Sequence, residues 1–141
     1  MQVAVAGRLF DLEFARTREQ QQRGLGGRAE IEPFGGMLFG YDPPKPLMMV
    51  MRDCPIPIDV AFVDSAGRVL DLYAMQPEPP RGVDESRADY ESRLKRYGGR
   101  VMAQFAVEVG GGRLEDLGVG VGDRLSADWD ELLRQVRAGG G

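Results

Sequence analysis

The sequence predicts a mainly β (α+β) domain, built as a compact, barrel-like antiparallel sheet of six or seven strands with short helices. Short apolar runs that alternate every second residue recur along the chain, and glycine-containing bends join several of them into hairpins. Helical patterns are few: we expect helices near residues 17–23 and 85–97 and a C-terminal helix near 127–138. Because strands and helices do not alternate regularly, a doubly wound parallel sheet is not expected.

The chain begins with a predicted hairpin and a short helix. In "VAVAGRLFDLEFA" two alternating runs flank Gly7, which supplies the bend. Thr17 and Gln20 then have the spacing of a capping box, in which each side chain bonds to the backbone of the other. Gly24 is placed to end this helix, because glycine adopts the left-handed cap conformation at little cost.

Several strands are predicted in the middle of the chain. "GGMLFGY" and "LMMVM" indicate two strands separated by a stiff "DPPKP" loop. "IDVAFVD" and "RVLDLYAM" indicate a hairpin around "SAG", and their high apolar content predicts a place near the sheet centre. "VMAQFAVEV" alternates strictly, so we expect one apolar face from Val101 to Val109. "RLEDLG" indicates a single helical turn, and "VGDRL" indicates a last short strand.

Two further segments have helical periodicity. "SRADYESRLKRYGG" predicts a surface helix with an apolar stripe, and its charges have the i, i+4 spacing of the pairs Asp89–Arg93 and Glu91–Lys95. "SADWDELLRQVRAGGG" predicts a C-terminal helix that Ser126 can cap. The apolar stripe of this second helix consists of Trp129, Leu132, Leu133 and Val136. That stripe either folds back onto the barrel or docks on a neighbouring chain.

Composition excludes several classes of function. The chain has 141 residues, the length of one domain. Its net charge is −4 and it contains no cluster of basic residues, so nucleic acid is not an expected partner. No apolar run is long enough to span a bilayer and no export signal is recognisable, so we expect a cytoplasmic protein and no membrane partner. Without histidine there is no His-dependent nucleophile, and Cys54 alone cannot build a thiolate metal site. We therefore expect no metal and no cofactor.

The segment "MMVMRDCPIPIDVAFVD" holds the most conspicuous polar residue. Asp59 lies between Ile58 and Val60 in an otherwise apolar strand, and a buried carboxylate without partners would cost several kcal/mol. It must therefore bond to backbone amides or to arginines. We favour a structural brace, with ligand binding or acid–base chemistry as the alternative. Cys54 and the methionines are interpreted as packing residues.

Several motifs, in order, resemble those of the domain-of-unknown-function 192 family. They are "RGLGGR", "GMLF", "MRDCPIPIDVAFVD", "GRV", "FAVEV" and "LGVGVGDRL", which together cover about residues 3 to 125. Within them, Arg23, Arg28 and Arg52 match basic positions of the family pattern, and Asp59 matches its aspartate. Arg52, Asp53 and Cys54 replace the usual lysine, asparagine and threonine.

The resemblance implies a compact β-rich domain, here residues 1–125, and no established reaction. The C-terminal helix and glycine tail, residues 126–141, lie outside the common core, as does the stretch around 77–99.

Three functions remain open. The favoured one is a non-enzymatic binding or assembly module, for instance a stabilising component of a larger, virus-like complex, with a protein partner or a second copy bound through the C-terminal helix. It predicts exposed methionine-rich surface. The second is a small-ligand or carbohydrate-binding domain, with Tyr73, Arg52, Asp53 and Asp59 around one mouth of the barrel. The third is a histidine-free hydrolase with paired carboxylates, which predicts an acid with a raised pKa in a cleft.

Overall fold

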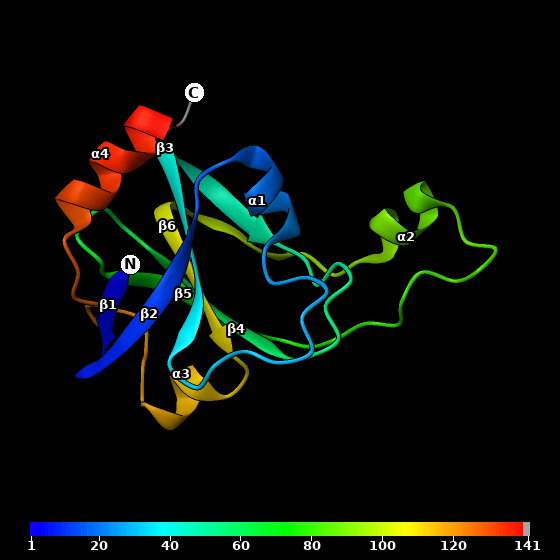
Figure 1. Ribbon diagram of the computed structural model, residues 1–141, viewed down its shortest axis with the longest axis horizontal. Coiled ribbons are helices and arrows are strands. Elements are labelled where there is room, and N and C mark those ends of the chain that lie inside the picture. Colours follow the sequence, from blue (N-terminus) through cyan, green and yellow to red (C-terminus); the bar gives the residue numbers. More distant parts are fainter. Residues whose placement is uncertain (140–141) are drawn as a thin grey trace.

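A computed structural model describes residues 1–139, and over these residues the chain forms one curled six-stranded sheet with short helices around it (Figure 1). The strands are β1 (Gln2–Val5), β2 (Arg8–Ala15), β3 (Gly35–Met49), β4 (Ile58–Val63), β5 (Val69–Met75) and β6 (Tyr97–Gly110). The helices are α1 (Arg18–Arg23), α2 (Arg87–Arg93), α3 (Arg113–Asp116) and α4 (Trp129–Gly139). The predicted mainly β fold class is confirmed.

The sheet has the order β1-β2-β3-β6-β4-β5, and one of its strand pairs is parallel. The chain leaves the C-terminal end of β2, passes through α1 and a long loop, and returns along the strand before it enters β3, so β2 and β3 run side by side in one direction. The other four strand pairs are antiparallel, as predicted, and the pairing of β2 with β3 departs from the prediction. The long strands β3 and β6 occupy the centre, whereas β5 lies at an edge and not at the predicted central position.

A short segment joins the two edges of the sheet and gives it the shape of a half-barrel. The backbone of Ser126 exchanges hydrogen bonds of 2.7 and 2.9 Å with Ala4 on β1. Three residues earlier, the carbonyl of Asp123 accepts a 2.7 Å hydrogen bond from the Val69 amide on β5. The predicted strand "VGDRL" is thus not a continuous strand but a bridging segment. It forms one isolated pairing beside β5 at Arg124, and the next residue after it, Ser126, forms another with β1.

The strand β3 continues through the proline-rich stretch that was predicted to be a loop. Gly40 pairs with Phe105 of β6 and Lys45 pairs with Ala103, so residues 41–44 form a bulge. A bulge tolerates prolines because its residues need not donate to the ladder. Opposite this bulge the side chains of β6 change face: Phe105 belongs to the first hydrophobic core and Ala103, two residues earlier, belongs to the second. The predicted single apolar face of β6 is therefore interrupted.

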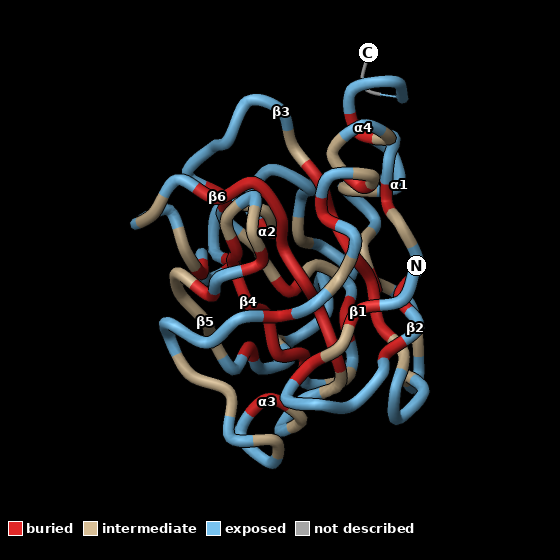
Figure 2. The backbone as a smooth tube through the Cα atoms, turned by 90° about the vertical axis from the view of Figure 1, so that its left-hand side faces the viewer, coloured by how far each residue is buried: buried red, intermediate tan, exposed pale blue. Residues whose placement is uncertain are grey.

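Both faces of the sheet are buried, which is why the central strands carry apolar residues at nearly every position (Figure 2). The first core lies on the face covered by α4 and includes Phe10, Leu12 and Phe105. The second core lies on the opposite face, under the loops that follow α1 and β3, and includes Phe39 and Phe62.

The C-terminal helix α4 packs on its own chain, which is the first of the two predicted alternatives. Trp129, Leu132 and Val136 are buried in the first core, and Leu133 is partly buried against it. The helix is capped by Asp128, whose carboxylate accepts a 3.1 Å hydrogen bond from the amide of the residue three positions later. Ser126, the predicted cap, instead pairs with β1. Helix α4 runs through Gly139, and the rest of the predicted glycine tail lies outside the described residues.

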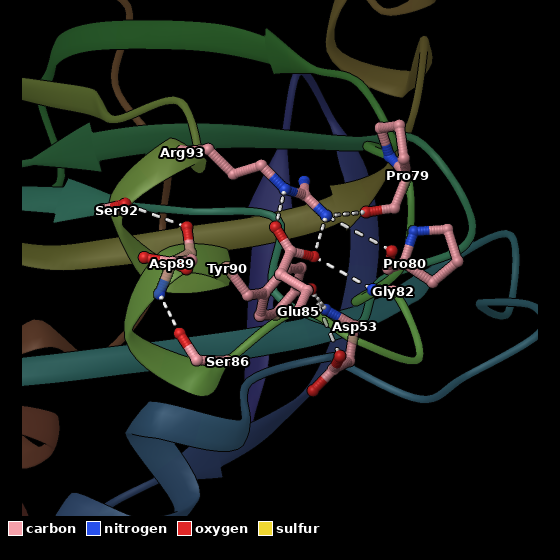
Figure 3. Close-up of polar contacts among 10 residues, drawn as sticks. All are labelled: Asp53, Pro79, Pro80, Gly82, Glu85, Ser86, Asp89, Tyr90, Ser92 and Arg93. Carbon is pink, nitrogen blue, oxygen red and sulfur yellow. Dashed lines mark hydrogen bonds and ion pairs between the residues drawn. The ribbon is translucent and has the colours of Figure 1, made fainter.

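The segment around α2 forms an arm that projects away from the sheet (Figure 1). The helix is shorter than predicted because Leu94 ends it and Tyr97 already begins β6. Arg93 pairs with Glu85 at 2.7 Å instead of the predicted Asp89. Figure 3 shows this guanidinium reaching the carbonyls of Pro79 and Pro80, so one arginine holds both ends of the arm's loop.

Candidate functional site

A cavity of about 420 Å³ opens on the face of the second core. Its wall is formed by α1 and the loop after it, by β3, by residues 48–54, by the start of β4 and by β6, and the α2 arm adds residues at the mouth. Its volume lies within the range of about 300–1,000 Å³ that is usual for small-molecule sites.

Glu108 of β6 lines this cavity and has no partner. Its neighbours across the sheet are Met37 and Val60, its side chain is only 6% exposed, and within residues 1–139 its carboxyl group forms no hydrogen bond and no ion pair. A Cβ atom at Gly24 would lie 3.6 Å from Oε1 of Glu108, so the end of α1 lies directly beside the carboxyl group. Burial raises the pKa of Glu108 from 4.5 to about 7.

Glu108 is not among the site residues predicted from the sequence. Strict alternation along "VMAQFAVEV" predicts one apolar face from Val101 to Val109 and leaves this glutamate on the other face. In the structure β6 is central and both of its faces are covered, so the same alternation points Glu108 into the second core. The one signal in the sequence is its place in the "FAVEV" motif of the family resemblance.

Two more weak acids surround the bottom of the cavity and remain protonated near neutral pH. Burial, together with the charge of nearby Glu108, raises the pKa of Tyr41 to about 12. Burial also raises the pKa of the Cys54 thiol, which donates a 3.4 Å hydrogen bond to the carbonyl of Ile56. A protonated, hydrogen-bonded thiol is a poor nucleophile, which fits the interpretation of Cys54 as a packing residue.

The mouth of the cavity is positively charged. Arg18 and Arg23 from α1 and Arg96 from the end of the α2 arm are exposed there, and in the described part of the chain none of them forms an ion pair. Arg52 is different, because it forms a bidentate pair of 2.6 and 2.7 Å with Glu91 of α2. The hydrogen bond from Arg52 lowers the pKa of Glu91. Three guanidinium groups therefore remain available to an anion.

Asp59 is buried on the other face of the sheet and is held by a backbone amide. Its Oδ2 accepts a 3.0 Å hydrogen bond from the Leu114 amide of α3, and the side chain is 4% exposed. The predicted amide partner is thus confirmed. None of the predicted arginines pairs with Asp59. Arg28 pairs with Glu13, and Arg23 and Arg52 line the cavity that holds Glu108, on the opposite face of the sheet.

The four residues predicted to surround one mouth are only partly brought together. Asp59 and Tyr73 both line a second, smaller cavity of about 280 Å³ beside α3, whereas Arg52 lines the cavity that holds Glu108. Tyr73 pairs with Val60 in the sheet, and its hydroxyl donates a 2.6 Å hydrogen bond to Asp71. Asp53 bonds to the Tyr90 hydroxyl of the α2 arm, as Figure 3 shows. Adjacent residues of a strand point to opposite faces, and this alternation places Asp59 away from the larger cavity.

The hydrolase hypothesis predicted an acid with a raised pKa in a cleft, and Glu108 is such an acid. It also needs a second carboxylate beside the first, and the alternation along the strands bears on that requirement. Asp59 is paired with Val109 and Glu108 with Val60, so the two most buried carboxyl groups project from opposite faces of the sheet. They cannot flank one bond, as a pair of catalytic carboxylates must. Among residues 1–139 there is also no group of three or more acidic or cysteine side chains placed to hold a metal ion. None of the described helices is long and apolar enough to cross a membrane.

Comparison with known proteins identifies the family. The family model DUF192, whose description is "Uncharacterized ACR", matches residues 1–127. The chain belongs to the domain-of-unknown-function 192 family. No curated protein matches it.

Two solved structures of similar fold are each 26% identical to this member of the domain-of-unknown-function 192 family. A protein of unknown function from Novosphingobium aromaticivorans DSM 12444 has a TM-score of 0.69 over 89% of this chain and 82% of its own. A protein from Sinorhizobium meliloti 1021, whose name calls it a candidate transcription regulator, has a TM-score of 0.70 over 91% of both chains.

Proposed function

We propose that this protein is a non-enzymatic binding module that holds a small organic anion in the cavity above Glu108. The observation that carries the proposal is the side chain of Glu108, which is only 6% exposed, while its carboxyl group opens to the cavity and has no partner among the described residues. An unpaired buried polar group costs free energy, and a site that receives a ligand is one place where such a cost is offset.

The walls of the cavity support a small ligand. Phe39 and Tyr41 contribute aromatic surface, and Leu25, Met51 and Ile58 contribute apolar surface. Polar and charged side chains line the rest of the cavity. In small-molecule sites the burial of apolar surface supplies affinity, and the polar groups supply orientation. The unpaired arginines at the mouth favour a ligand with a negative group. The net charge of −4 argues against a nucleic-acid backbone as the partner.

Motifs from four separate parts of the chain meet at this cavity. "RGLGGR" contributes Arg23 and the glycines that follow, "GMLF" contributes Phe39, "MRDC" contributes Arg52 and Cys54, and "FAVEV" contributes Glu108. The motifs by which the sequence resembles its family are therefore, in large part, the walls of one cavity.

Assembly is a second candidate, favoured by a separate observation. Met48 and Met102 lie on the neighbouring strands β3 and β6 and are 54% and 60% exposed. Methionine-rich exposed surface is what an assembly module predicts. Since the apolar stripe of α4 is buried in its own chain, such a contact would use the exposed parts of β3 and β6 around Met48 and Met102. Measuring the mass of the protein in solution tests it: a dimer that Met48→Gln and Met102→Gln together convert to a monomer supports assembly, and a monomer throughout contradicts it.

The binding function is tested by nuclear magnetic resonance. We would titrate 15N-labelled protein with a panel of small organic acids ranging from acetate to citrate. We expect at least one acid to cause saturable shifts at the amides of Gly24, Gly26 and Arg52, with the Leu114 amide on the opposite face unchanged.

A matched pair of variants locates the binding. Cys54→Met narrows the cavity and should weaken the binding, whereas Cys54→Ser keeps its size and should not. If no acid shifts the amides at the cavity, or if both variants bind as the wild type does, the proposed function is wrong.

A further inference from the structure

We infer that the ligand is an elongated amino acid, with its carboxylate at the arginine mouth, an apolar spacer along the walls and its amine on Glu108. The inference rests on the proposed function and deepens it. Three parts of the cavity carry it: the unpaired acid at the bottom, the apolar walls and the unpaired guanidinium groups at the mouth.

The bottom of the cavity lacks a hydrogen-bond donor with a positive charge. The side chain of Glu108 is only 6% exposed, and none of the guanidinium groups that line the cavity lies within ion-pair distance of its carboxyl group. The Cys54 thiol already donates to the carbonyl of Ile56. A protonated amine supplies both donors and the opposite charge, and charge-assisted hydrogen bonds are about twice as strong as neutral ones. A buried acid without a protein partner therefore selects for an amine.

The walls require the two ends of the ligand to be separated. Leu25, Phe39, Met51 and Ile58 also line the cavity, and all four are buried members of the second core. A charged or hydrated group beside them would lose its water without compensation. An amine and a carboxylate on the same carbon atom would place one of the charges on this apolar surface. Methylene groups suit this part of the cavity better.

The mouth provides the site for the carboxylate. Arg18, Arg23 and Arg96 are unpaired among the residues that the structure describes, whereas Arg52 is neutralised by Glu91. Guanidinium groups bind carboxylates through two parallel hydrogen bonds, so one of the three suffices. Glu91 lies on the α2 arm, so this arm tunes the charge at the mouth.

Binding of an amine should be linked to loss of a proton from Glu108. Below about pH 7 the free carboxyl group holds its proton, and an ammonium group prefers the ionised form. The affinity should therefore rise between about pH 6 and pH 8. The other titratable and charged groups at the cavity are Tyr41 on β3, Cys54 before β4, Arg18 and Arg23 on α1, and Arg52, Glu91 and Arg96 at the mouth. The two acids among them that share the bottom with Glu108 have raised pKa values and keep their protons in this range.

Calorimetric titration of the full chain at about pH 8 tests the inference with three probes that share a chain of six carbon atoms. They are 6-aminohexanoate, hexanoate, which lacks the amine, and hexylamine, which lacks the carboxylate. We expect 6-aminohexanoate to bind about tenfold or more tightly than either of the others. In the isosteric variant Glu108→Gln its advantage over hexanoate should fall to about twofold or less.

The triple variant Arg18→Gln, Arg23→Gln, Arg96→Gln is the complementary test, since it should weaken the binding of both carboxylates and leave that of hexylamine unchanged. The inference is overturned if 6-aminohexanoate binds no better than hexanoate, or if its advantage survives in Glu108→Gln. Should other acids of the wider panel bind in the cavity while these probes do not, the ligand class is wrong and the binding function stands. If nothing binds there, both are wrong.

Discussion

Replacement of Glu108 by glutamine should change how the stability of the protein depends on pH. The folded state keeps this carboxyl group protonated up to about pH 7, whereas the unfolded chain releases the proton near 4.5. Between these values the folded state binds more protons than the unfolded state, so the free energy of unfolding falls as pH rises. Glutamine does not titrate, so this decline should be absent from Glu108→Gln.

The magnitude follows from the two pKa values. The interval from 4.5 to about 7 corresponds to roughly 3 kcal/mol at about 1.4 kcal/mol per pH unit. Between about pH 5 and pH 8 the wild type should therefore lose up to roughly 3 kcal/mol relative to the variant. For a chain of this length that difference corresponds to roughly 10 °C in Tm.

The assay is urea unfolding of both proteins in steps across this pH range at constant ionic strength. Carboxyl groups whose pKa is lowered by arginine neighbours, such as Glu13 and Glu91, contribute mainly below the range and cancel in the difference. Glu19→Gln, an exposed change on α1, is the matched control and should follow the wild type. A difference between wild type and Glu108→Gln that does not vary with pH would refute the reasoning, because the carboxyl group would then be solvated or paired.

Three further predictions concern the framework around the cavity. Asp59→Leu should lower the free energy of unfolding by about 1–3 kcal/mol, because it leaves the Leu114 amide without its acceptor; unchanged denaturant stability would contradict the brace. Leu132→Ala should lower the free energy of unfolding by about 2–5 kcal/mol, because this side chain of α4 is only 2% exposed in the first core. Almost no loss of stability in the monomer would show that a partner, and not its own chain, holds the helix. Glu91→Gln should cost at most about 1 kcal/mol, since its pair with Arg52 is about one-third exposed, and the loss should shrink at high salt; a larger or salt-independent loss would show that the pair is more than a surface contact.

The sequence by itself determined the local features of this protein. Thr17 and Gln20 form the predicted capping box because both partners lie within one turn of the same helix. The hairpins around Gly7 and around residues 64–68 form as predicted, since a bend and two alternating runs suffice to specify them. The partner requirement of Asp59 was also foreseeable, because the cost of an unpaired carboxylate does not depend on which amide satisfies it.

Only the tertiary structure decided which residues share a cavity. Glu108 and Asp59 both occupy apolar strands, yet strand order and register place one carboxyl group at an open cavity and the other against α3. The parallel pairing of β2 with β3 and the passage of β3 through its prolines depend on contacts between segments far apart in the chain. Such contacts arise from packing and not from local periodicity, and a shift of one residue in register exchanges the two faces of a strand. For that reason the motifs could be recognised in the sequence, while the cavity they enclose could not.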